Sequence, residues 1–172
     1  TAPLAWLSIA EHLFAESNLS GAIRAYQHVV DSQADEGTRH YAHFKLAWCS
    51  YNHADYHKAL DVFVMLAQTA GDPLRREASK DAVRVYTEVG APEDLHAWLA
   101  ALLGDPGQIA AEGERGVASW RARGLEAEAQ RAEASLRSAA PSPGALSAQH
   151  KGAASDALAA GRLADAVTAL SR

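Results

Sequence analysis

Apolar residues recur at helical spacing in two early segments of the chain, and each segment contains one break. In the first segment the recurring positions are Trp6, Ile9, Ala10 and Leu13, then Ala22, Tyr26 and Val29 after a break at 17–19. In the second they are Leu46 and Ala47, then Ala59, Phe63 and Leu66 after a break at 54–56. Apolar positions three or four residues apart form one face of a helix, so each segment predicts a helical hairpin.

The same pattern recurs along the rest of the chain. Ala22 and Ala59 are equivalent positions 37 residues apart, and three later segments repeat the arrangement around turns at Gly90, Gly124 and Gly161. In the third segment Pro92 follows the turn, at a position that suits the start of a helix. The pattern therefore predicts five hairpins, at approximately 3–36, 40–73, 76–105, 110–143 and 147–172.

The first two hairpins resemble the tetratricopeptide repeat (TPR), whose signature is W-x2-L-G-x2-Y, then A-x3-F, then P. Hairpin one carries the resemblance through Trp6, Ile9, Ala10, Leu13, Ala22 and Tyr26, and hairpin two through Leu46, Ala47, Tyr56, Ala59 and Phe63. Both lack the glycine that the signature has in its first helix. The resemblance implies an all-α fold, a right-handed α-solenoid of about five TPR-like hairpins that fills residues 3–172 as a single array.

The repeats also resemble, more narrowly, those of large envelope-associated proteins of δ-proteobacteria, including gliding-motility components. This likeness implies a bacterial protein of the periplasm or cytoplasm, with the periplasm favoured, and a place in an envelope or motility assembly.

Stacked hairpins need small residues where helices cross and large residues between layers. We expect the crossings at Ala10, Ala22, Ala47, Ala59, Ala129 and Ala166. We expect Trp6, Tyr26, Leu46, Phe63, Leu136 and Leu170 to fill the gaps between layers. The last predicted helix keeps an apolar stripe with no polar helix after it, so we expect this edge to be covered by a longer chain or by self-association.

Composition and charge exclude some partners. The net charge of −5 is spread along the chain without a basic stripe, so we expect no nucleic-acid partner. The longest apolar runs fall well below the roughly 20 residues that a bilayer crossing needs, so we expect no membrane insertion. The single Cys49 lies among helix-forming residues and is expected to be a buried small side chain.

The sequence contains none of the common catalytic or nucleotide-binding motifs, so we expect neither an enzyme nor a cofactor. The alternative is a metal site or an enzymatic role centred on the four histidines of the second hairpin, His40, His43, His53 and His57. Their two pairs are expected near opposite ends of one helix, about 15 Å apart at 1.5 Å per residue, too far for one ion. Five carboxylates are expected on solvated faces or turns: Glu11, Glu16, Asp31, Asp55 and Asp61.

In tetratricopeptide proteins the first helices of the hairpins line a concave face, and the resemblance implies a binding groove for a protein or peptide there. In the second hairpin Leu46, Ala47 and Ser50 form the packing stripe. A separate aromatic stripe, Tyr41, Phe44, Trp48 and Tyr51, recurs at i, i+3, i+7 and i+10.

We predict that this stripe, with Asn52, binds an apolar peptide or a partner helix. The predicted surface extends to Leu7, Glu11 and Phe14 in the first hairpin and to Glu77, Lys80 and Arg84 in the third. The alternative is that the aromatic residues fill the interior between helices. The family's cationic clamp for a peptide C-terminus is not expected, because Leu7 and Glu11 stand where basic and amide groups would be needed.

Overall fold

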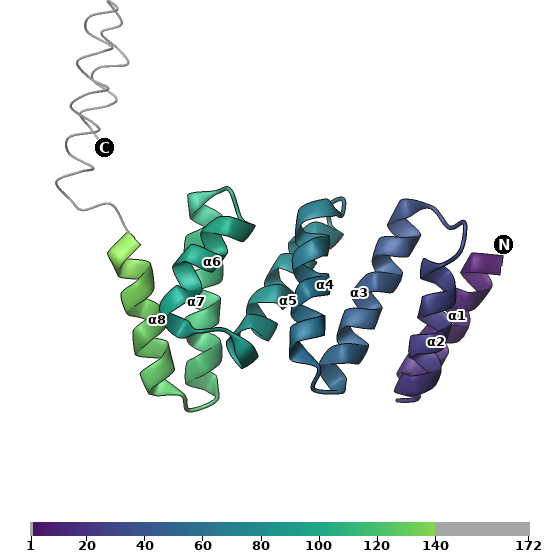
Figure 1. The fold of residues 1–172 in the computed structure, drawn as a ribbon, viewed down its shortest axis with the longest axis horizontal. Helices are drawn as coiled ribbons and strands as arrows, with labels where there is room; N and C mark the ends of the chain where they lie inside the picture. Colours follow the sequence, from purple (N-terminus) through teal and green to yellow (C-terminus); the bar gives the residue numbers. More distant parts are fainter. Residues whose placement is uncertain (1, 140–172) are drawn as a thin grey trace, which may run out of the picture. The chain divides into compact units, whose positions relative to one another are not determined.

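The computed structural model describes residues 2–139, which form eight α-helices and one short 3-10 helix and contain no β-strand. In chain order the elements are α1 (Ala2–Ala15), α2 (Leu19–Val30), α3 (Glu36–Asn52), α4 (Tyr56–Thr69), α5 (Leu74–Val89), η1 (Pro92–Asp94), α6 (Leu95–Leu102), α7 (Pro106–Ala122) and α8 (Glu126–Ala139) (Figure 1). The predicted all-α class is confirmed. The helices follow the first four predicted hairpins: α1–α2, α3–α4, α5–α6 and α7–α8.

Residues Thr1–Leu136 form one compact unit. The predicted fifth hairpin at 147–172, with Ala166 and Leu170, lies outside the described residues, as does the edge predicted to be covered. None of the helices within residues 2–139 has both the length and the apolar character that a bilayer crossing requires.

Three of the four hairpin turns share one backbone geometry. Their key residues, Ser17, Ala54 and Gly124, have φ angles of 59°, 60° and 76°. In each turn the next residue donates its amide to a carbonyl five residues back: Asn18 to Leu13, Asp55 to Ser50 and Leu125 to Trp120. A left-handed residue with such a bond closes the first helix and reverses the chain. Ser17 and Ala54 are 37 positions apart, so the turn geometry repeats with the sequence.

Side-chain caps begin the second helix of the first two hairpins. The Asn18 side chain accepts a hydrogen bond from the Gly21 amide at 3.0 Å, and the Asp55 side chain accepts one from the Lys58 amide at 3.4 Å. Such bonds satisfy amides that have no partner inside the helix. The polar breaks seen in the sequence are therefore the caps of α2 and α4.

The turn of the third hairpin is built differently. Gly90 ends α5 with φ −83°, and the 3-10 helix that follows separates it from α6. The Tyr86 ring stacks on Trp98 with centroids 4.2 Å apart, and its hydroxyl donates to the Ala91 carbonyl at 3.0 Å. A Cβ at Gly90 would lie 2.4 Å from Cζ of Tyr86. This turn therefore depends on a side-chain contact rather than on a left-handed residue.

The predicted crossing alanines are buried wherever the structure describes them. Ala10, Ala22, Ala47, Ala59 and Ala129 all have no exposed surface. Among the predicted gap-filling residues, Tyr26 and Phe63 are fully buried, while Leu46 and Leu136 are half-buried. Small side chains at these points allow the backbones of paired helices to approach closely.

Two predictions for α1 are wrong. Trp6, expected between layers, is 39% exposed, and Ile9, expected in the packed stripe, is 46% exposed. Trp6 stacks on His28 of α2 with ring centroids 4.2 Å apart. Within residues 2–139 the partners of α1 are α2 and the side chains of α3, so the remaining face of this very apolar helix has no described helix against it.

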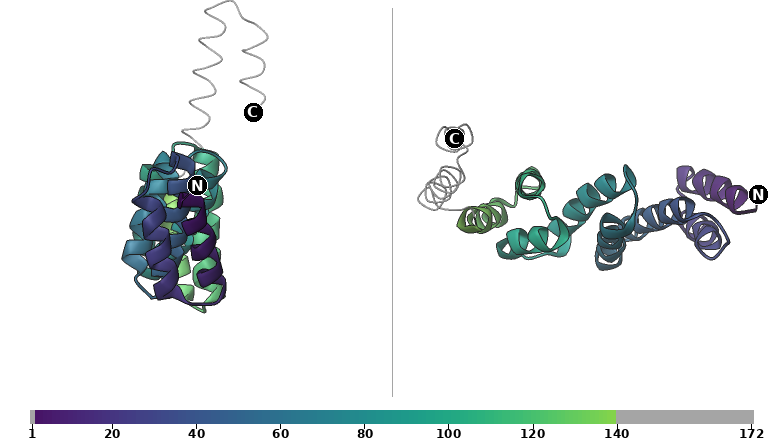
Figure 2. Two further views of the ribbon diagram at one scale, coloured as in Figure 1. Left: turned by 90° about the vertical axis from the view of Figure 1, so that its right-hand side faces the viewer. Right: turned by 90° about the horizontal axis from the view of Figure 1, so that it is seen from above.

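Helices of successive hairpins lie next to one another; α1–α2 and α3–α4 also pack as pairs, whereas α6 packs mainly on α7 rather than on α5. α2 packs on α3 and α4 on α5, while α3 also contacts α5 and α5 contacts α7 (Figure 1, Figure 2). The first helices α3, α5 and α7 are therefore neighbours in that order, and this arrangement brings the predicted site residues of α3 and α5 together.

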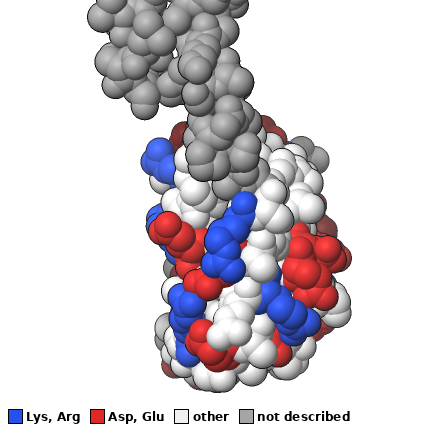
Figure 3. Space-filling view, turned by 90° about the vertical axis from the view of Figure 1, so that its left-hand side faces the viewer, with Lys and Arg blue, Asp and Glu red and all other residues white. Residues whose placement is uncertain are grey.

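At the other end of this unit, the α8 surface is charged. Arg121 of α7 pairs with Glu133 of α8, and Arg131 lies 3.4 Å from Glu93 and 3.5 Å from Glu128. Figure 3 shows basic and acidic side chains interspersed on this side. This charged surface of α8 contrasts with the exposed apolar side chains of α1.

Candidate functional site

The aromatic stripe of α3 is partly core and partly surface. The rings of Phe44 and Trp48 meet the buried Phe63 of α4 edge to face, with centroids 5.4 and 5.6 Å apart. Tyr51 packs against Trp48 in the same way at 5.4 Å. Tyr41 is 37% exposed, and the other three side chains of the stripe are half-buried. The sequence left two alternatives open for this stripe: a partner-binding surface, or a filling of the interior between helices. Each describes one edge of the stripe, because the inner edge packs on α4 and the outer edge reaches the surface.

The α1 members join the stripe through Lys45. Its ammonium lies 3.3 Å from Oε2 of Glu11 and 4.2 Å from the centroid of the Phe14 ring. The Tyr26 hydroxyl donates to Oε1 of the same carboxylate. The expectation that Glu11 sits on a solvated face is therefore wrong: it is half-buried and links α1, α2 and α3. Burial, with Glu11 adding to it, raises the pKa of Tyr26.

Leu7 and Asn52, the two remaining predicted residues near the stripe, differ in their surroundings. Leu7 is half-buried against the core of the first hairpin. Asn52 is the last residue of α3 and is exposed.

The α5 members lie beside the stripe. The Arg84 guanidinium carbon is 5.5 Å from the centroid of the Trp48 ring, a cation–π arrangement. Lys80 is 2.8 Å from Oε1 of Glu77 on the same helix. The three predicted residues of this helix therefore extend the surface of α3.

Asp81 belongs to this group and was missed by the sequence reasoning. Burial raises its pKa to about 6, against the opposing effect of Arg84. The signal in the sequence was its position four residues after Glu77 and three before Arg84, which places it on the same helix face. A pattern of this kind does not reveal that α3 would partly cover the carboxylate.

Two clefts open between these first helices. The α3–α5 cleft has a volume of about 510 Å³ and a mainly apolar lining. Its lining residues are Gly37, His40, Tyr41, Phe44, Gly71, Asp72, Pro73, Leu74 and Glu77. The predicted Tyr41 and Phe44 thus form one wall of a cavity, a feature that the linear pattern did not indicate.

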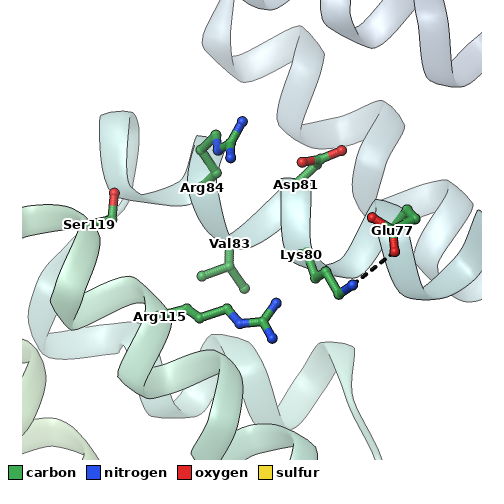
Figure 4. Close-up of a pocket in the computed structure, with 7 residues that line it drawn as sticks. All are labelled: Glu77, Lys80, Asp81, Val83, Arg84, Arg115 and Ser119. Atoms are coloured by element: carbon green, nitrogen blue, oxygen red, sulfur yellow. Dashed lines mark hydrogen bonds and ion pairs between the residues drawn. The ribbon is translucent and has the colours of Figure 1, made fainter.

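The α5–α7 cleft has a volume of about 400 Å³ and is lined by Glu77, Lys80, Asp81, Val83, Arg84, Arg115 and Ser119. Figure 4 shows the side chain of Arg115 on α7 passing beside Val83 of α5, with its guanidinium group on the side of Lys80. Glu77 lines both clefts. The two cavities therefore lie on either side of α5.

Helix α7 contributes groups that the sequence reasoning did not assign to the site. Besides Arg115 and Ser119, it carries Glu112, whose Oε1 is 3.5 Å from Arg115. Oε2 of Glu112 is buried without a hydrogen-bond partner, and burial raises the pKa of this carboxyl group. Ser119 also bonds Thr87 of α5 at 2.9 Å, which fixes α7 against α5.

The four histidines do not converge. His40 lies 3.8 Å from Glu36, and burial, with His40 and Arg39 adding to it, lowers the pKa of His43. His53 and His57 are exposed beyond the other end of α3. Across residues 2–139 no group of three or more His, Cys, Asp or Glu side chains has a geometry that could hold a metal ion.

Cys49 is fully buried, as predicted. Burial raises the pKa of its thiol to about 11, so the thiol is protonated at neutral pH.

Comparison of the chain with protein-family models, with curated proteins and with solved structures finds no match.

Proposed function

We propose that this chain is a tetratricopeptide-like α-solenoid with a right-handed superhelical course. Its function, in this proposal, is to bind a peptide or a helix of a partner protein, without catalysis. The repeat assignment is supported by the recurrence of turn geometry at Ser17 and Ala54, by the fully buried crossing alanines, and by the contacts between consecutive first helices.

One observation carries the proposed binding role. The first-helix face, defined by Tyr41, Phe44, Trp48, Lys80 and Arg84, combines partly exposed aromatic side chains with two clefts, one lined by Tyr41 and Phe44 and the other by Lys80 and Arg84. Aromatic residues and arginine are enriched at the centres of protein interfaces, because aromatic rings bury large areas with few rotatable bonds and arginine offers several hydrogen-bond donors on a planar group.

The polar groups of this face support a binding role rather than a chemical one. Glu11 is engaged by Tyr26 and Lys45, Glu77 by Lys80, and Arg84 by the Trp48 ring. Groups held by one another in this way orient a partner and set its charge preference, but none is positioned as a nucleophile beside a general base.

The test uses the full chain with a photo-crosslinking amino acid at one of two exposed sites. Tyr41 lies on the first-helix face, and His57 lies on the second helix of the same hairpin. We expect a partner from the source organism to crosslink through position 41 and not through position 57, and Arg84→Ala to weaken that crosslink. Equal crosslinking at both positions, unaffected by Arg84→Ala, would contradict the proposal.

A further inference from the structure

The two clefts of the first-helix face differ in chemistry. The α3–α5 cleft presents the rings of Tyr41 and Phe44 together with Pro73 and Leu74. At about 510 Å³ it falls in the size range of cavities that accept small ligands and single side chains. Apolar walls of this kind favour an apolar or aromatic occupant, because such a side chain displaces water without losing hydrogen bonds.

The α5–α7 cleft carries an excess of positive charge near neutral pH. Three cations line it, Lys80, Arg84 and Arg115, against the carboxylates Glu77 and Asp81. Arg115 reaches from α7 into the same space as Lys80 (Figure 4). Glu112, which is not part of the lining, pairs through Oε1 with Arg115 at 3.5 Å and keeps Oε2 buried and unbonded. Burial raises the pKa of Asp81 to about 6, so this carboxyl group is still mostly ionised at pH 7, and the lining keeps two acidic side chains against three basic ones. An anionic group between Arg115 and Lys80 would complement this arrangement.

The spacing of the two clefts follows from helix packing. They flank α5 and share Glu77, and neighbouring helix axes lie about 8–10 Å apart. An extended chain advances about 3.3 Å per residue, so about three residues separate a side chain in one cleft from a side chain in the other.

We infer that the partner is an extended segment that places an apolar side chain in the α3–α5 cleft and an acidic side chain, about three residues away, in the α5–α7 cleft. This inference rests on the proposed binding function and gives the partner its chemistry.

The experiment selects binders to the full chain from a displayed library of random nine-residue peptides. We expect enriched peptides to pair an apolar residue with Asp or Glu at a spacing of about three. Selected peptides are then synthesised, and their dissociation constants are measured by fluorescence anisotropy for four variants of the chain.

The variants form two matched pairs. Arg115→Ala is compared with Arg131→Ala on α8, because both side chains are 52% exposed. Tyr41→Ala, at 37% exposed, is compared with Trp6→Ala on α1, at 39%. We expect the first member of each pair to weaken binding about three- to tenfold and the second to change it little. Reversing the acidic residue of the peptide to Lys should weaken binding to the wild-type chain and have less effect on Arg115→Ala.

The outcomes separate this inference from the proposed function. If the selected peptides need Tyr41 and Arg115 for binding but lack the apolar–acidic spacing, the inference is overturned and the proposed binding function stands. Peptides with basic residues in place of the acid also overturn it alone. Failure to select any binder, or binders that ignore both substitutions, overturns the inference and the proposed function together. A peptide signal that falls as the protein concentration rises indicates that a second copy occupies the clefts, and this outcome also overturns the inference.

Discussion

The third hairpin and the other three described hairpins reverse the chain by different means. In the first, second and fourth hairpins, a left-handed residue at position 17, 54 or 124 closes the turn. The amide of the next residue donates a hydrogen bond to the carbonyl five residues before it. In the third, Tyr86 folds over Gly90, stacks on Trp98 and bonds the Ala91 carbonyl. The first kind of turn is local and can be repeated at any hairpin, whereas the second needs a partner side chain on the next helix.

The second helices differ in the same way. Ala59 of α4 is fully buried at the crossing with α3, while Ala97 of α6 is exposed and the buried positions of α6 are Leu95 and Leu99. The second hairpin thus brings its backbones together through alanine, whereas α6 presents larger side chains to a core that it shares with α5 and α7. Three predictions test this difference, and a fourth concerns the pH dependence of α5.

The largest effect is expected where a regular hairpin is overfilled. Ala59→Leu adds three carbons at a crossing with no free space, and we expect it to lower the free energy of unfolding by about 3 kcal/mol. The control is Ala97→Leu, the same change at an exposed position of α6, which should alter stability by less than about 0.5 kcal/mol. Urea unfolding followed by circular dichroism measures both, and equal losses in the two variants would remove the distinction between the hairpins.

The third hairpin should be broken by a single methyl group. In Gly90→Ala the new Cβ meets a tyrosine ring that Trp98 and a hydrogen bond hold in place, so we expect a loss of about 2 kcal/mol. Gly104→Ala serves as the control, since a Cβ there has no atom within 4 Å. In the double variant Gly90→Ala with Tyr86→Leu the clashing ring is gone, so its loss of stability should be smaller than the sum of the two single losses. A loss equal to that sum would contradict the steric explanation.

Both local turns should be more stable with glycine than with alanine at the left-handed position. Ala54 holds φ 60°, a conformation that costs an alanine about 1 kcal/mol, so Ala54→Gly should stabilise the protein by up to that amount. Gly124→Ala, at φ 76°, should cost about 1 kcal/mol although a Cβ there meets no neighbour within 4 Å. Thermal unfolding of the two variants measures the shifts, and a gain from both substitutions would exclude the shared geometry.

The smallest effect concerns the pH dependence of α5. Burial raises the folded-state pKa of Asp81 from 3.8 to about 6, while Arg84 and Lys80 oppose the shift and Glu77 adds to it. A carboxyl group with a raised folded pKa destabilises the fold when ionised, so stability from this group rises as the pH falls from above 6 toward 4. We expect Asp81→Asn to remove this rise. The measurement compares unfolding midpoints at pH 7 and pH 5, and an unchanged difference between wild type and variant would contradict the assignment.

Much of the helical layout could be predicted from local signals. The breaks at 17–19 and 54–56 are the caps Asn18 and Asp55, and the glycines at 90 and 124 lie at turns. The exposure of Trp6 and Ile9 could not be predicted, because a helix with apolar residues around most of its surface does not indicate which of them a neighbour covers. The bond from Tyr26 to Glu11 joins residues on different helices and leaves no periodic trace.

The candidate site was predicted in part. The stripe on α3 and its neighbours on α5 do lie together, because first helices are adjacent. Arg115 and Glu112 were missed because their helix showed no apolar or charged stripe that pointed to α5. Whether Phe44 and Trp48 were core or surface depended on where Phe63 falls, and they are half-buried against it.

The sequence by itself determined the all-α class, the positions of the hairpin turns and the alanines that are buried at helix crossings. These features depend on residues a few positions apart, whose spacing alone decides which helix face they share. The clefts on either side of α5, the linking role of Glu11 and the raised pKa of Asp81 were decided only by the tertiary structure. Each arises where side chains from two or three helices meet, and the distances between those helices are set by packing rather than by position in the chain.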